Sequence, residues 1–139
     1  MLVKERNLRK LLLLVGILMM TVAFTGCQRT PLPVTIPDSA LEVALRNALN
    51  KPEGPIYKSD LESLTYLDLT EKNISDISAL SGLTNLWLLD LTDNNISDIS
   101  ALSGLTNLEW LDLDDNPLSQ KAINIHIPQL EARGVEVIR

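Results

Sequence analysis

Three aspartates, Asp68, Asp90 and Asp112, recur at intervals of 22 residues, and each lies between two leucines. The alternation of leucine and aspartate indicates a strand that buries its leucines and exposes its aspartates. If such strands pair side by side, the carboxylates lie about 4.8 Å apart. A ladder of carboxylates at this spacing offers oxygen ligands to a calcium ion or attracts a basic segment of another protein. A third interpretation is that the aspartates belong only to the repeated strand sequence.

Aromatic residues flank the same strands, and the hydrophobic pattern of the repeat does not require them. Tyr66, Leu88 and Trp110 occupy equivalent positions, and Trp87 lies at one margin. Tyrosine and tryptophan are favoured anchors in protein interfaces. We therefore predict a binding face made by Tyr66, Asp68, Thr70, Trp87, Leu88, Asp90, Thr92, Trp110, Asp112 and Asp114.

Residues for catalysis are sparse. His126, the only histidine, lies between isoleucines, and Cys27 is the only cysteine. The many acids make a glycosidase-like pair of carboxylates possible by spacing, but they line an open sheet that would not exclude water. We predict no enzyme activity, no catalytic residue and no metal site built from a known motif.

The elements that position these residues come from a duplication. Residues 64–85 and 86–107 are nearly identical, and a third copy begins at Leu108 and then diverges. Their L-x-x-L-x-L-x-x-N-x-L pattern resembles the leucine-rich repeat, and most closely the 22-residue repeats of internalin-like bacterial proteins. The resemblance implies an α/β solenoid, a short right-handed coil with parallel strands on its concave face. Isoleucines and leucines that recur every three residues in each repeat predict tight helical turns on the opposite side.

The asparagine of the pattern is present as Asn94 and Asn116, and Lys72 replaces it in the first repeat. An inward amide can pair with backbone groups that a turn leaves unsatisfied. Lysine cannot complete such a ladder, so the first repeat is expected to turn differently or to expose its edge.

Both ends of a solenoid need caps, because the terminal layers would otherwise expose the core. We predict an N-terminal helical cap and partial repeat at 38–63, repeats at 64–118, and a C-terminal cap helix and edge strand at 119–139. Pro128 is expected to kink or divide the last helix. The first helix, over 38–49, would bury one face formed by Leu41, Ala44, Leu45, Ala48 and Leu49.

Residues 1–26 predict a signal peptide, because a basic start precedes an apolar run of 14 residues, from Leu11 to Phe24. As a helix the run spans about 21 Å, less than the ~30 Å hydrocarbon core of a membrane. Its end, Phe24-Thr-Gly-Cys27, resembles the bacterial lipoprotein signal, although phenylalanine replaces the usual leucine. The resemblance implies lipidation of Cys27 by diacylglycerol and an N-acyl chain, with no other cofactor. Residues 27–37, with three prolines, would form a lipidated tether.

Charge restricts the partners. From residue 28 onward the chain has 8 Lys and Arg against 17 Asp and Glu, which argues against nucleic acid. We therefore predict a lipoprotein exported to the bacterial cell envelope, at the outer membrane or cell surface. It would be a monomeric domain that acts as an adhesion or protein-binding module, and a basic protein or peptide would suit its acidic face. The alternative is a small calcium-dependent or purely structural envelope protein without a dedicated ligand.

Overall fold

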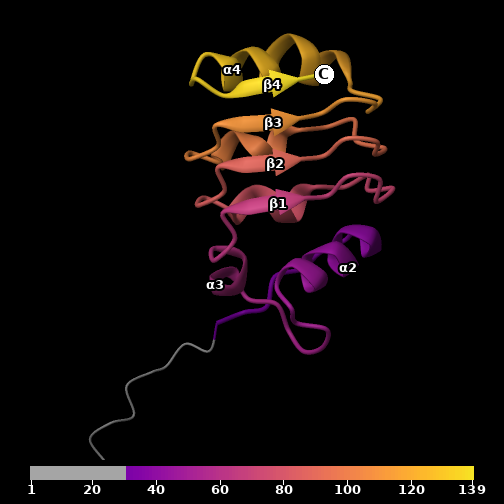
Figure 1. Ribbon diagram of the computed structural model, residues 1–139, viewed down its shortest axis with the longest axis vertical. Coiled ribbons are helices and arrows are strands. Elements are labelled where there is room, and N and C mark those ends of the chain that lie inside the picture. Colours follow the sequence, from indigo (N-terminus) through magenta and orange to yellow (C-terminus); the bar gives the residue numbers. More distant parts are fainter. Residues whose placement is uncertain (1–30) are drawn as a thin grey trace, which may run out of the picture. The chain divides into compact units, whose positions relative to one another are not determined.

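Four short strands stack into one parallel sheet in the order in which they occur in the sequence. The computed structural model describes residues 31–139. The strands succeed one another along the solenoid in Figure 1; they are β1 (Tyr66–Asp68), β2 (Leu88–Asp90), β3 (Trp110–Asp112) and β4 (Glu136–Ile138). In β1, β2 and β3 the central leucine is buried and its two neighbours are at least partly exposed, as the alternation predicted.

The register places equivalent residues of successive repeats side by side. Tyr66 pairs with Leu88 and Leu88 with Trp110, while the aspartates pair in the same way two positions later. β4 continues the sheet, since Glu136 pairs with Trp110. The sequence predicted an edge strand here, and β4 makes the sheet four strands wide.

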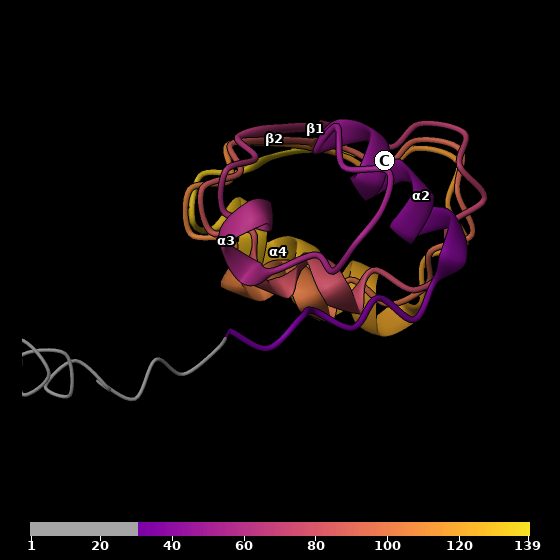
Figure 2. The same cartoon turned by 90° about the horizontal axis from the view of Figure 1, so that it is seen from below.

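Tight 3₁₀ helices form the opposite side of the solenoid: η1 (Ser78–Gly82) and η2 (Ser100–Gly104). The expectation of tight turns is confirmed here. Seen along the solenoid, the sheet and the helical turns form two opposite walls, and the repeats superimpose (Figure 2). The core between the walls is aliphatic, and eight of its isoleucines and leucines come from the turns of the two full repeats: Ile74, Ile77, Leu80, Leu83, Ile96, Ile99, Leu102 and Leu105.

A buried asparagine closes the turn between the first two repeats. Asn94 Nδ2 donates to the carbonyl oxygens of Leu69, Leu91 and Thr92, and its Oδ1 accepts the N–H of Ile74. Asn94 thus forms hydrogen bonds with backbone groups of its own repeat and of the preceding one. Its 5% exposure leaves these backbone groups little access to water, so the side chain replaces solvent as their partner.

Lys72 does not leave the first repeat open, because its Nζ donates to the carbonyl oxygen of Thr70 at 2.9 Å. In the second repeat the equivalent carbonyl, that of Thr92, accepts the N–H of Glu71 from the repeat before. The expected exposed edge is therefore capped at this position by the lysine amine. The first repeat does turn differently at Asn73, which has a φ of 60°.

The N-terminal cap contains α2 (Ser39–Ala48) and the single turn α3 (Lys58–Leu61). Asp38 caps α2, since its carboxylate accepts the N–H groups of Ala40 and Leu41. Proline and glycine follow the helix, so the chain returns to the first repeat through a loop. The predicted buried face of α2 holds for its first part only, because Ala48 is exposed.

The proposed tether is shorter than the sequence predicted. Pro33 forms an antiparallel bridge with Tyr57, and the N–H of Val34 donates to the carbonyl of Ile56 at 2.7 Å. Val34 and Ile36 also pack against the core. Alternation of apolar residues with prolines and threonine allows this segment to add an extended layer to the cap, so residues 33–36 belong to the folded domain.

The C-terminal cap begins with a wide turn, η3 (Ala122–His126), and continues as α4 (Ile127–Glu131). Pro128 lies at the start of α4, where its missing N–H has no helical partner to lose. This division of the helix agrees with the predicted effect of the proline. Ala122, Ile127 and Leu130 are buried as expected, and Ile123 is half-buried.

The signal peptide and Cys27 lie outside the described residues. Within residues 31–139, no helix has the length and apolar character needed to cross a membrane.

Candidate functional site

The open face of the sheet, hereafter the sheet face, and its margins bring together all ten residues of the predicted binding face. Tyr66, Leu88 and Trp110 form one row across the first three strands. Tyr66 is 51% exposed, and the other two side chains are partly exposed. Asp68, Asp90 and Asp112 form the second row, and Thr70, Thr92 and Asp114 follow the strand ends.

The aspartate row has a structural task that the sequence did not reveal. Oδ1 of Asp68 accepts the N–H of Thr70 at 3.0 Å, and Asp90 and Asp112 bond in the same way two residues ahead. The amide and hydroxyl of Thr70 lower the pKa of Asp68. Each aspartate thus supports the turn that ends its own strand. This favours the interpretation of the row as part of the repeat.

The phenol of Tyr66 remains a hydrogen-bond donor over a wide pH range. Partial burial and the negative charge of Asp68 both raise the pKa of Tyr66. A neutral hydroxyl beside a carboxylate, on a half-exposed ring, combines apolar contact area with a polar tip. This is the chemistry of an interface anchor and not that of a general base.

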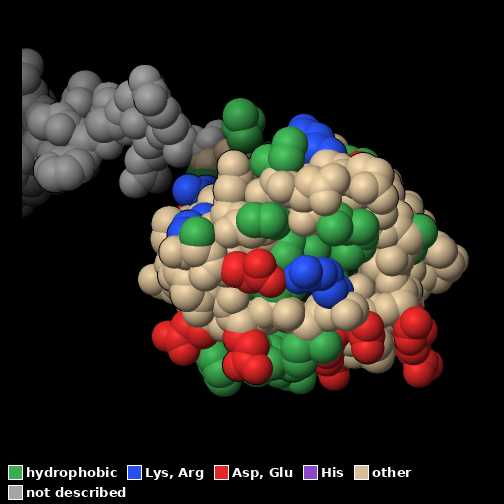
Figure 3. All heavy atoms as spheres, turned by 90° about the horizontal axis from the view of Figure 1, so that it is seen from above, with side chains coloured by type: hydrophobic (Ala, Val, Ile, Leu, Met, Phe, Trp, Pro, Cys, Tyr) green, Lys and Arg blue, Asp and Glu red, His purple; other side chains and the backbone are tan. Residues whose placement is uncertain are grey.

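Two margins border the sheet face. At the strand starts, Trp87 is 45% exposed, and its carbonyl accepts the N–H groups of Glu109 and Trp110. At the strand ends, Glu71, Asp93 and Asp115 all have positive φ, which turns the chain sharply away from the sheet. Both margins carry acids. Figure 3 views the solenoid from its C-terminal end, and acidic and hydrophobic side chains alternate along the sheet side at the bottom of that view.

β4 adds two residues to the site that sequence reasoning did not include. Glu136 extends the row of Trp110, and Ile138 extends the row of Asp112. The alternation of residues 135–138 indicated a strand, but it could not show which strand is its partner. That partner is set by the length and packing of the C-terminal cap.

The side chains that most often ligate metals do not cluster among residues 31–139. No group of three or more histidine, cysteine, aspartate or glutamate side chains in this part of the chain could hold a metal ion. The aspartate row also commits one oxygen of each carboxylate to its own turn. Only the second oxygen of each carboxylate could then reach a calcium ion without loss of the turn bond.

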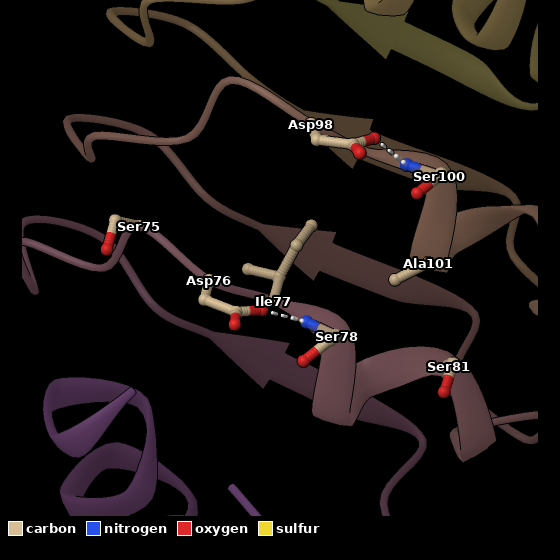
Figure 4. A pocket seen from close by; sticks show the side chains of 8 residues that line it. All are labelled: Ser75, Asp76, Ile77, Ser78, Ser81, Asp98, Ser100 and Ala101. Carbon is tan, nitrogen blue, oxygen red and sulfur yellow. Dashed lines mark hydrogen bonds between the residues drawn. The ribbon is translucent and has the colours of Figure 1, made fainter. Parts of the chain in front are cut away.

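A groove of about 520 Å³ lies on the helical side, between the turns of the two full repeats. Asp76 accepts the N–H of Ser78 and Asp98 that of Ser100, both at 2.8 Å (Figure 4). The amide and hydroxyl of Ser100 lower the pKa of Asp98. These carboxylates start the 3₁₀ helices, so we assign the groove a structural role.

His126 is placed for packing. Its Nδ1 and Nε2 are both buried, and neither bonds to a described residue. The adjoining cavity, lined by Ile99 and Leu130 among others, measures about 30 Å³. A cavity of this size holds about one water molecule and no substrate.

Comparison with known proteins gives a family match over part of the chain and several similar structures. Residues 62–118 match the family described as leucine rich repeat. The chain is similar in structure to an internalin (inlF) from Listeria monocytogenes, with 27% identity, a TM-score of 0.65, and coverage of 80% of this chain and 32% of the internalin. It is also similar to the functional domain of InlJ from the same organism, with 29% identity, a TM-score of 0.62, and coverage of 74% and 22%.

A third similar structure contains the CBM51-2 and INT domains of ZmpB from Clostridium perfringens. Its identity is 31% and its TM-score 0.52, with coverage of 59% of this chain and 18% of that one. The chain thus spans a third or less of the length of these structures. No curated protein matches the sequence.

Proposed function

We propose that this chain, whose stacked repeats and parallel sheet form an α/β solenoid of the leucine-rich-repeat type, is a protein-binding or adhesion module of the bacterial cell envelope. Its lipid anchor would be attached to Cys27, and its partner would contact the sheet face. The envelope assignment rests on the sequence of residues 1–27. The binding assignment rests on the fold and on the exposed side chains of the sheet face.

One observation supports binding most directly. Tyr66, Leu88 and Trp110 stand in register on a face that no described segment covers, with Trp87 beside them. The framework does not need these residues, because the leucines between the rows already fill the core. Aromatic side chains lose little conformational entropy on binding and bury a large area, so they can supply most of the affinity.

The size of the sheet face limits that affinity. Four strands spaced about 4.8 Å apart, each three residues long, offer a surface well below the ~800 Å² per partner of a standard interface. Binding by this face alone is therefore weak. Neighbouring surfaces, or many copies clustered on one membrane, would be needed to strengthen it.

Replacing Tyr66 or Trp110 with alanine is expected to weaken binding to the partner by about tenfold each, or about 1.4 kcal/mol. The partner would be isolated from envelope extracts with the wild-type protein and titrated against each variant. Ile125→Ala is the matched control, because Ile125 is 47% exposed but lies in the C-terminal cap. Equal affinity of all three variants would contradict the assignment of the sheet face.

Replacing Cys27 with alanine is expected to abolish incorporation of labelled palmitate and to release the protein from membranes. The chain has no other cysteine to accept the diacylglycerol group. Growth with labelled fatty acid, followed by membrane fractionation, measures both effects. Thermal unfolding of the released variant should match the wild type, and labelling that survives the substitution would refute the lipid anchor.

A further inference from the structure

We infer that a groove at the strand-start margin binds a lysine or arginine side chain of an extended peptide lying on the sheet face. This inference rests on the proposed function and names the chemistry of its partner. The groove has a volume of about 750 Å³, and its lining includes Trp87, Trp110, Glu109, Glu136, Arg133 and Gly134. Only the two tryptophans belong to the binding face that the sequence predicted.

Backbone hydrogen bonds hold the lining residues in a fixed row. The N–H of Glu109 donates to the carbonyl of Trp87, and the N–H of Glu136 donates to the carbonyl of Glu109, both at 2.8 Å. Glu136 is also the register partner of Trp110. Two carboxylates and two indole rings from three successive layers of the solenoid thus lie around one space.

The two glutamates lack a neutralising partner within the described residues. Neither Glu109 nor Glu136 takes part in an ion pair there. Arg133, the only base in the lining, donates to the carbonyl oxygens of Ser103 and Leu105, at 2.6 and 2.8 Å. It therefore stabilises the end of η2 without an ion pair to Glu109 or Glu136, and the lining, with two carboxylates against one guanidinium, keeps a net negative charge for an external cation.

The remaining properties of the groove favour a cationic side chain on a peptide. Indole faces attract lysine and arginine, and carboxylates bind both cations through charge-assisted hydrogen bonds. A Cβ atom added at Gly134 would meet nothing within 4 Å, so the space beside this glycine is open. Residues 31–139 carry 17 acids against 7 Lys and Arg, which draws basic partners to the domain as a whole.

Tryptophan fluorescence tests the inference directly, because both tryptophans of the chain line the groove. The full chain in mild detergent would be titrated with two pools of octapeptides that alternate threonine and valine. One pool carries arginine at a fixed central position, and the other carries citrulline, which has the same shape without the charge. We expect the arginine pool to bind at least tenfold more tightly, with affinity that falls as salt rises.

The variant Glu109→Gln/Glu136→Gln should remove this preference for arginine. Asp93→Asn/Asp115→Asn is the matched control, since it changes the charge equally at the opposite margin. Equal binding of the two pools, binding of neither pool at millimolar concentration, or an unchanged preference in the glutamine variant would overturn the inference. So would quenching by N-acetylglucosamine without preference for arginine, which would indicate a carbohydrate. In each case the affinity of the Tyr66→Ala variant for the partner isolated from envelope extracts would still test the proposed function separately.

Discussion

Replacing Asp38 with alanine is expected to lower the free energy of unfolding by about 2–3 kcal/mol at neutral pH. One oxygen of this carboxylate caps α2 through the N–H groups of Ala40 and Leu41. The other accepts the N–H groups of Ser75 and Asp76 in the first repeat. A single side chain thus joins the N-terminal cap to the solenoid, and urea unfolding monitored by tryptophan fluorescence measures its contribution.

The same carboxylate gives the stability a defined pH dependence. Desolvation disfavours its charge, but the N–H groups of Ser75, Leu41 and Asp76 outweigh that cost and lower the pKa from 3.8 to about 2. Because the folded-state pKa is the lower one, the stabilisation is fully present above pH 3.8 and is lost as pH falls through about 2. The difference in stability between wild type and Asp38→Ala should therefore shrink across this interval.

Asp38→Asn separates the two tasks of the side chain. Asparagine remains a good N-cap, so α2 keeps its first turn. Its amide group would face the N–H groups of Ser75 and Asp76, where a donor cannot replace an acceptor. About half of the loss in unfolding free energy seen for alanine is expected. The part of the pH dependence that comes from residue 38 should disappear, because asparagine does not titrate. An asparagine variant as stable as the wild type would show that the link to the first repeat contributes nothing.

Replacing Asn94 with leucine should have the largest effect, a loss of at least about 3 kcal/mol. Leucine fits the volume but leaves the N–H of Ile74 and the carbonyl of Leu69 without the partner that each now has, while the carbonyl of Leu91 keeps its bond from Asn116 Nδ2. A buried backbone group without a partner costs more than the hydrogen bond itself contributes. Urea unfolding gives the total loss, and amide hydrogen exchange at Ile74 reports the turn itself.

Two other asparagines calibrate this result. Asn116 makes the same kind of contacts to the second repeat but is only partly buried, so water can replace some of its bonds. Asn95 is exposed, and alanine there should change stability by less than about 0.5 kcal/mol. The expected order of losses is Asn94, Asn116, Asn95. A loss at Asn94 no greater than that at Asn95 would contradict the buried role.

The repeat itself can be recognised in the sequence, because local residue types determine it. A period of 22 residues with leucines at fixed positions defines the strands, and the spacing of three defines the turns behind them. The register follows from the same pattern, since a shift by one residue would expose the leucines. For that reason the rows of Tyr66 and Asp68 are predictable from the amino-acid sequence alone.

The tertiary structure decided what each polar side chain does. Asp38 and Ser75 are far apart in sequence, and nothing local indicates that the cap helix starts at the turn of the first repeat. In the same way, Glu136 joins the row of Trp110 only because the C-terminal cap places β4 beside β3 as the next parallel strand. Such contacts depend on how whole layers stack, and a pattern repeated within one layer carries no information about them.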